Sequence, residues 1–272
     1  MLSLPKANNA ECVRKVREIF PGPFLVAPIL FIAAIVVLVL TGLMMDPVAI
    51  DQFFDQSGYS PFELATIPVF AAIIPLVWWK CPFAGSTRRK VTLSIMVTIV
   101  VLMAIVKELD LHLTVIHWLY PDYVSESGSV VSGMLYKPNG DMIGGTPFKS
   151  RVLFNAAAPF GMRAFIFAYF ALFFGVFGVG FVYLLPSFFK GVFRLEPCAW
   201  AAGCFGASGV LVQITDRLPA WTEHILGERA ESLCTVLEEG GEMLLAAFAL
   251  LTIYLGYRKL RHENKANCYG HL

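Results

Sequence analysis

Several long apolar runs restrict this chain to a membrane-spanning fold. A helix needs about 20 apolar residues to cross the hydrocarbon core of a bilayer. Residues 24–45 form one such run, and residues 162–189 form another. Inside lipid, the backbone amide and carbonyl groups must be hydrogen-bonded within the segment itself, so we expect these runs to be helices. The sequence therefore predicts an all-α polytopic helix bundle in a lipid bilayer.

The bundle is predicted to have about six transmembrane helices within residues 24–257. The predicted spans are residues 24–45, 62–79, 91–112, 162–189, 197–215 and 238–257. Hydrophobic residues make up 57% of the chain and charged residues 15%, whereas about 25% of residues are charged in soluble domains. A soluble protein of this length could not bury so much apolar surface. The sequence contains no basic patch of the kind that binds nucleic acid.

The distribution of Lys and Arg predicts the orientation of these spans. One side holds residues 1–23, the loops at 80–90 and 190–196, and the basic tail 258–272. That side carries 14 of the 21 Lys and Arg residues but only four of the 20 acids. Cytoplasmic loops are enriched in basic residues, so both termini are predicted to be cytoplasmic.

One long loop, residues 113–161, is predicted on the extracytoplasmic side between the third and fourth spans. Within it, two apolar stretches flank the dipeptide Asn139-Gly140. Asn-Gly between apolar stretches favours a hairpin turn, so we expect a small capping hairpin there.

Ionisable residues gather at the outer ends of the predicted spans, and two groups of them fall within the membrane. The third span has 16 apolar residues before Lys107, so it reaches full length only if residues 107–112 enter the outer bilayer. The sixth span has 15 residues between Glu242 and Arg258, which places Glu242 at membrane depth. Ionised groups there cost several kcal/mol unless they pair or face a wet cavity, so they are functional candidates.

Helical spacing relates these candidates to one another. Glu108 and His112 are four residues apart, as are Glu238 and Glu242, and this spacing places each pair on one helix face. If spans three, five and six pack together, the acids and the histidine converge below the outer surface. The candidate catalytic set is Glu108, Asp110, His112, Asp216, Glu239 and Glu242. Gly240 and Gly241 would let another helix or a ligand approach closely.

Three hypotheses fit this set. All of its members except Asp110 are candidate metal ligands, because carboxylates and an imidazole can hold a divalent metal ion that activates water. The same groups could relay protons or bind a cation. They could also neutralise one another and Lys107 as structural contacts. The helix dipole explains acids at helix N-termini, such as Glu63 and Glu238, but explains Glu108 and Glu242 poorly.

Basic residues near the same end suggest the substrate. Lys149, Arg151 and Arg163 lie where the long loop returns to the membrane, where they could bind the head group of a lipid-linked or other anionic substrate. They could equally be anchors in the head-group layer. The leading hypothesis is a metal-dependent hydrolase or transferase acting on a lipid-linked substrate. The alternatives are a proton- or cation-coupled transporter and a non-catalytic accessory subunit.

Two short segments resemble elements of a group of bacterial proteins. Glu108-Leu109-Asp110-Leu111-His112 ends the third span, and Leu237-Glu238-Glu239-Gly240-Gly241-Glu242 opens the last. Together they resemble uncharacterised small multi-pass bacterial inner-membrane proteins that carry Glu-Leu-Asp-x-His and Leu-Glu-Glu-x-x-Glu elements. The resemblance covers about a dozen residues. It implies location in a bacterial inner membrane and implies no activity.

Overall fold

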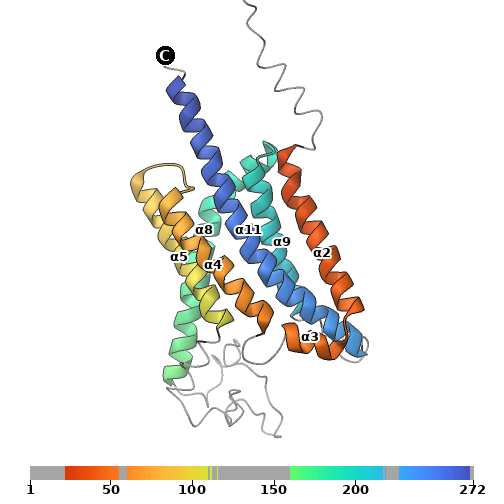
Figure 1. Cartoon of the computed structure of the whole chain (residues 1–272). Helices are drawn as coiled ribbons and strands as arrows, with labels where there is room; N and C mark the ends of the chain where they lie inside the picture. Colours follow the sequence, from red (N-terminus) through yellow and green to blue (C-terminus); the bar gives the residue numbers. More distant parts are fainter. Residues whose placement is uncertain are drawn as a thin grey trace, which may run out of the picture. The chain divides into compact units, whose positions relative to one another are not determined.

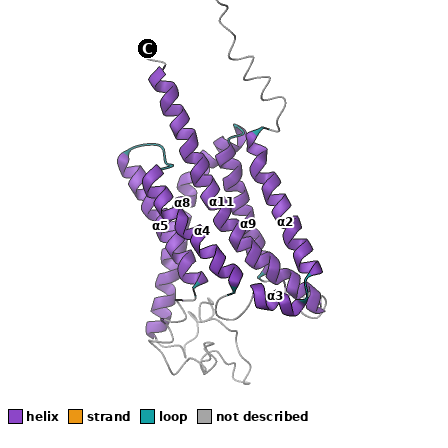
Figure 2. Cartoon of the chain, viewed as in Figure 1, coloured by secondary structure: helices purple, strands orange, loops and turns teal. Residues whose placement is uncertain are grey.

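The structure of the protein, a computed structural model, describes residues 22–54, 60–109, 160–216 and 227–269, together with residues 111, 115 and 218. The regular secondary structure of these residues is entirely helical (Figures 1 and 2), which confirms the all-α prediction for them. The main elements are η1 (Pro23–Leu25), α2 (Val26–Met44), α3 (Pro47–Phe54), α4 (Pro61–Lys80), α5 (Thr87–Glu108), α8 (Phe160–Phe193), α9 (Pro197–Thr215) and α11 (Gly227–Tyr269). The hairpin predicted within 113–161 falls outside the described residues.

Four of the described helices are long and apolar enough to cross a bilayer. They are η1 joined to α2 (Pro23–Met44), α5, α8 and α9. α4 has a shorter apolar stretch, Leu64–Lys80. Four of the six predicted spans therefore have helices of membrane-crossing length and composition.

Two helices begin several residues before the apolar runs from which they were predicted. α5 starts at Thr87 rather than at Val91, and the hydroxyl of Ser86 caps it by accepting a hydrogen bond from the backbone N–H of Arg89 (3.4 Å). α5 thus reaches 22 residues by Glu108 and does not need residues 109–112 to reach crossing length. α11 starts at Gly227, so the prediction that Glu238 opens the last helix is wrong. Hydropathy marks the part of a helix that lies in lipid, whereas backbone hydrogen bonding continues beyond it.

The chain divides into two compact units. Unit 1 comprises residues 1–84 and 185–272, and unit 2 comprises residues 85–184. α8 belongs to unit 2 up to Leu184 and to unit 1 from Leu185.

α11 is the central helix of unit 1, because it packs against α9, α4, α2 and α3 (Figure 1). We call the end of unit 1 where α2 and α9 begin the basic end, and the end where they finish the acidic end. An apolar cluster near the basic end joins α2, α9 and α11 through Ala27, Ala201, Cys204 and Phe248. At the acidic end, Ile50 and Phe54 of α3 pack on Val236 of α11. Between lipid-embedded helices, such close packing holds the bundle together.

In unit 2, α5 and α8 run antiparallel. A Cβ atom at Gly180 would lie 3.3 Å from the terminal methyl of Met96, and the Arg89 guanidinium lies 4.9 Å from the ring centroid of Tyr183. In this register the last turn of α5 lies beside Tyr169 of α8, which interacts electrostatically with Lys107.

Candidate functional site

The candidate acids Glu239 and Glu242 lie with Glu238 on one turn of α11, and neighbouring helices enclose that turn. Gly240 faces α2, where a Cβ atom would collide with the side chain of Leu38. Gly241 faces α9, where a Cβ atom would lie 2.7 Å from Cγ2 of Val212. The close approach expected at these glycines is therefore made by two helices. The glycines fix the rotation of α11, and with it the direction in which Glu239 and Glu242 project.

The depth of this turn follows from its neighbours. Leu38 lies six residues before the end of α2, and Val212 lies three residues before the end of α9. At 1.5 Å per residue, the turn is about 5–9 Å inside the acidic end. On the α4 side, the Thr66 hydroxyl lies 3.8 Å from the sulfur of Met243, five residues into α4. Glu242 is only 9% exposed at this depth, and Glu238 and Glu239 are half-buried.

The position of these acids along α11 removes one explanation for them. The positive end of the helix dipole acts only within the first turn of a helix. Since α11 starts at Gly227, Glu238 lies about three turns inside it and Glu242 about four. The dipole therefore does not stabilise either carboxylate. Their placement must be explained by tertiary contacts or by function.

The interior of unit 1 becomes apolar toward the basic end. The buried Phe248 side chain lies six residues from Glu242 in that direction, about 9 Å along the helix. Leu244, Leu251 and Leu255 pack against the same apolar cluster. Toward the basic end, the polar residues of α11 are thus followed by an apolar layer between α2, α9 and α11.

Unit 2 carries the other buried carboxylate. Glu108, in the last turn of α5, has a side chain that is 5% exposed, and its Oε1 lies 3.7 Å from Nζ of Lys107. The lysine side chain is 56% exposed. Glu108 is thus one of the acids that contact Lys107, as the structural hypothesis expects.

Arg163 lies in the first turn of α8, in unit 2. Tyr169, beside Lys107, lies six residues further along α8, so Arg163 is about 9 Å further toward the end of the helix pair. Its Nε is buried and has no hydrogen-bond partner among the described residues. A buried N–H donor without an acceptor costs free energy, and an anionic group bound beside it would remove that cost.

The predicted metal ligands do not form a coordination shell in the described part of the chain. No three His, Cys, Asp or Glu side chains of the described residues are close enough together to hold one ion. Asp216 is exposed at the end of α9, whereas Glu242 is buried. Asp110, His112, Lys149 and Arg151 lie outside the described residues. The acids that the structure does describe therefore do not fit a metal ion by themselves.

One basic residue that sequence reasoning missed has a clear structural role. Nη1 of Arg229 donates hydrogen bonds to the backbone oxygens of Leu43 (2.9 Å) and Met45 (3.4 Å). These carbonyls lie at the C-terminal end of α2, where a cation is favourable. Arg229 thus holds the start of α11 to the end of α2. Only its position in the polar segment before the last apolar run could have drawn attention to it.

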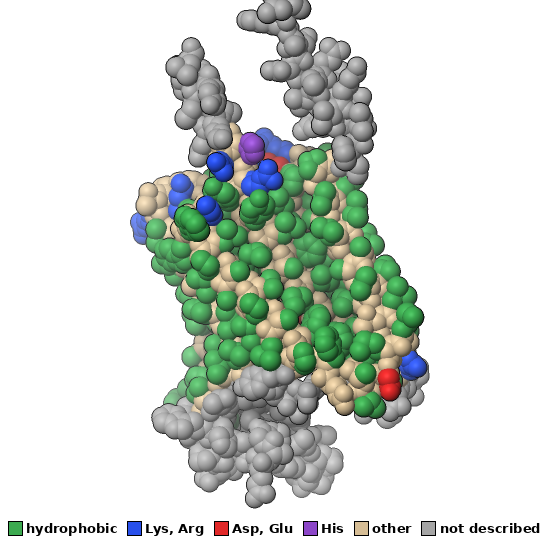
Figure 3. Space-filling view, viewed as in Figure 1, with side chains coloured by type: hydrophobic (Ala, Val, Ile, Leu, Met, Phe, Trp, Pro, Cys, Tyr) green, Lys and Arg blue, Asp and Glu red, His purple; other side chains and the backbone are tan. Residues whose placement is uncertain are grey.

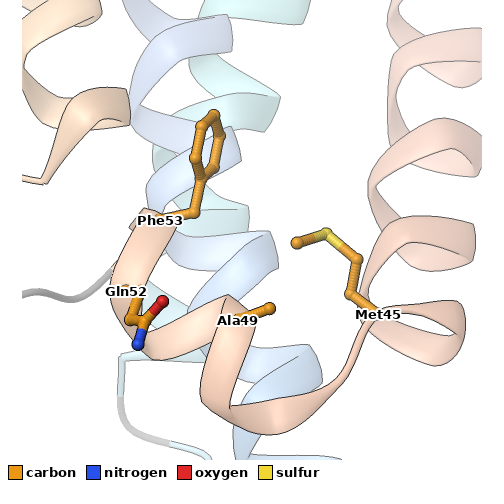
Figure 4. A pocket seen from close by; sticks show the side chains of 4 residues that line it. All are labelled: Met45, Ala49, Gln52 and Phe53. Carbon is orange, nitrogen blue, oxygen red and sulfur yellow. The ribbon is translucent and has the colours of Figure 1, made fainter.

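A shallow hollow lies at the acidic end of unit 1 (Figure 4). It is lined by Met45, which follows α2, and by Ala49, Gln52 and Phe53 of α3. Phe53 is 44% exposed, so the hollow presents an apolar wall to its surroundings. None of the candidate acids lines it. The hollow is therefore separate from the acidic turn of α11.

Comparisons of the chain with known protein families, with curated proteins and with solved structures gave no match. The site must therefore be interpreted from its own chemistry.

Proposed function

We propose that the chain is a six-span protein of a bacterial inner membrane, with both termini in the cytoplasm. α4 and α11 would supply the two spans beyond the four helices of clear crossing composition. The basic end of unit 1 would be cytoplasmic, because Lys and Arg are concentrated in the segments that connect there. The acidic turn of α11 would then open toward the extracytoplasmic side.

We propose further that this outer region is the site of a hydrolase or transferase acting on a lipid-linked anionic substrate. Two observations carry the proposal: a buried carboxylate in the last turn of α5, and a buried guanidinium Nε in the first turn of α8 that has no hydrogen-bond partner among the described residues. Glu108 provides a carboxylate of 5% side-chain exposure. Arg163 provides an N–H donor that has no acceptor among the described residues. Enzymes that transfer charged groups need both kinds of residue.

Each residue has a distinct role in this proposal. Arg163 would bind the anionic group of the substrate, with Lys107 as a second cation at the more exposed edge. Glu108 would accept a proton from the attacking water or acceptor hydroxyl. Glu242 lies in unit 1 and has no role in this proposal. Lys149 and Arg151 remain candidates for the head group, since the loop that carries them precedes Arg163 in the chain.

A metal ion is not needed for these roles. No three described His, Cys, Asp or Glu side chains form a ligand set, so in a metal-dependent form of the reaction His112 and other residues outside the described ranges would join Glu108. When bound, such an ion would polarise the substrate or its attacking water. We assign no step to it.

The apolar layer of unit 1 argues against a transport route past Glu242. A transporter needs a polar route that continues to the other side of the membrane. Inward of Glu242, the space between α2, α9 and α11 is filled by the Phe248 cluster. This cluster therefore favours the enzyme over a transporter that would use Glu242.

The test is turnover by the purified protein in proteoliposomes that contain fluorescent lipid phosphates and lipid pyrophosphates. We expect conversion of at least one of these lipids, detected by a change in chromatographic mobility. Glu108→Gln should lower the rate about 100-fold or more, as expected for the loss of an acid–base group. Asp46→Asn, which alters an exposed acid at the end of α2, is the matched control and should retain activity. Absence of conversion, or a Glu108→Gln variant as active as the control, would refute the proposal.

A further inference from the structure

The basic end of unit 1 carries a concentration of cationic side chains from three helices. α4 and α8 end here, and α11 continues past the other helices of the unit (Figure 1). Figure 3 shows Lys and Arg side chains gathered around the emerging part of α11. The cations of unit 1 described at this end are Lys80, Lys190, Arg194, Arg258, Lys259 and Arg261. Among the described side chains of this end, Glu196 is the one acid.

Glu196 lies between the cations of α8 and those of α11, and its carboxylate forms an ion pair with Lys259. Nζ of Lys259 lies 2.7 Å from Oε2 of Glu196. A Cβ atom at Gly191 of α8 would lie 3.1 Å from the same oxygen, and the backbone N–H of Glu196 donates to the carbonyl of Gly191 (2.9 Å). The end of α8, the start of α9 and α11 are therefore contiguous. Lys190, Arg194, Arg258 and Arg261 are exposed on this surface.

Large exposed aromatic side chains lie among the cations. Trp79 is 81% exposed, and Phe193, next to Arg194, is 84% exposed. Nζ of Lys80 lies 4.1 Å from the ring centroid of Trp79 and 5.4 Å from that of Tyr257. Aromatic rings and cations are interleaved in this way where a protein meets the head-group layer of a bilayer. A surface that binds a soluble acidic partner would not need to leave Trp79 and Phe193 so exposed.

We propose that this surface binds the anionic head groups of phospholipids in the leaflet at the basic end. The exposed cations of α8 and α11 bind the phosphates, while Trp79 and Phe193 lie among the acyl chains and glycerol groups beside them. Clusters of Lys and Arg next to a membrane helix attract anionic lipid, each cation contributing about a fivefold gain in affinity. This proposal does not depend on the enzymatic one.

The test is a titration of the purified full-length protein in detergent with short-chain phosphatidylglycerol, and with short-chain phosphatidylcholine as the neutral lipid. We expect saturable binding of phosphatidylglycerol, with an affinity that falls as salt is added. Arg258→Gln combined with Arg261→Gln should weaken that binding about 30-fold, because two cations are lost. Phosphatidylcholine should bind weakly to both proteins.

The matched control carries the same change in net charge elsewhere. Arg88→Gln combined with Lys90→Gln removes two cations from the first turn of α5, in unit 2. It should retain most of the affinity for phosphatidylglycerol. Equal losses in the two double variants would show a diffuse effect of net charge and overturn the proposal. So would unchanged binding by Arg258→Gln/Arg261→Gln. Thermal unfolding without added lipid checks that both variants remain folded.

Discussion

Replacing Gly42 with alanine tests how closely α2 approaches α11. Gly42 is buried near the end of α2 and faces Leu233 of α11. A Cβ atom at this position would lie 2.8 Å from Cδ1 of Leu233 and 3.1 Å from its Cα. The leucine methyl could rotate away, but its Cα belongs to the helix backbone. The two helices would therefore have to separate.

The expected cost follows from two opposing effects. Inserting a methyl group into a packed contact costs about 1–3 kcal/mol. Alanine is favoured over glycine inside a helix by about 0.5–1 kcal/mol. Gly42→Ala should therefore destabilise the protein by up to about 2.5 kcal/mol. Gly206 in α9 provides the control, since a Cβ atom there would have nothing within 4 Å among the described residues. Gly206→Ala should show only the gain in helix propensity.

Thermal unfolding of the two variants in the same detergent measures the difference. A change of 1 kcal/mol shifts Tm by about 2–4 °C in a chain of this size class. Gly42→Ala should unfold several degrees below Gly206→Ala. Equal Tm values would mean that α2 and α11 are not in close contact at Gly42. The position assigned to the acidic turn of α11 would then lose its support.

Three further changes test other contacts of unit 1. Leu195 ends α8 with φ at +56°, a left-handed conformation that costs a non-glycine residue about 1–2 kcal/mol. Leu195→Gly should therefore raise Tm, whereas Leu195→Ala should not. Arg229→Gln removes the charged donor from the α2 carbonyls, so the free energy of unfolding in denaturant should fall by about 1–2 kcal/mol, and Arg229→Lys should lose less. Lys259→Met leaves the half-buried Glu196 without its cation; because Lys259 is 40% exposed, the loss should be about 0.5–1 kcal/mol. Adding Glu196→Gln should recover it, and a double variant no more stable than Lys259→Met would contradict this account.

The apolar runs alone predicted the fold class, because a bilayer leaves few structures for such segments. The helix boundaries were harder to predict from the sequence. The segment 227–237 is too polar to suggest a membrane span, yet Leu233 and Val236 give it an apolar side that packs on α2 and α3. It therefore extends α11 by about three turns. This extension also removed the helix dipole as an explanation of Glu238.

The candidate site was predictable only in part. The shortfall of apolar residues in spans three and six drew attention to Glu108 and Glu242, which are the two buried acids among the described residues. Partners could not be predicted in the same way, because contacts such as Arg229 with the end of α2 join residues 186 positions apart in the chain. Small residues were informative only at some positions. Gly241 contacts α9, whereas a Cβ atom at Gly178 would meet nothing within 4 Å among the described residues.

The most direct test of the proposed orientation, and of the apolar layer in unit 1, is the side from which Glu242 can be reached. Glu242→Cys, in a variant without the six native cysteines, would be inserted into sealed vesicles and treated with a membrane-impermeant thiol reagent. A second variant with its one cysteine in the tail 258–272 would mark the cytoplasmic side. We predict that the reagent modifies Glu242→Cys from the side opposite the tail and not from the tail side. Modification from the tail side would show a route through the apolar layer and contradict the account, as would a cysteine that cannot be reached from either side.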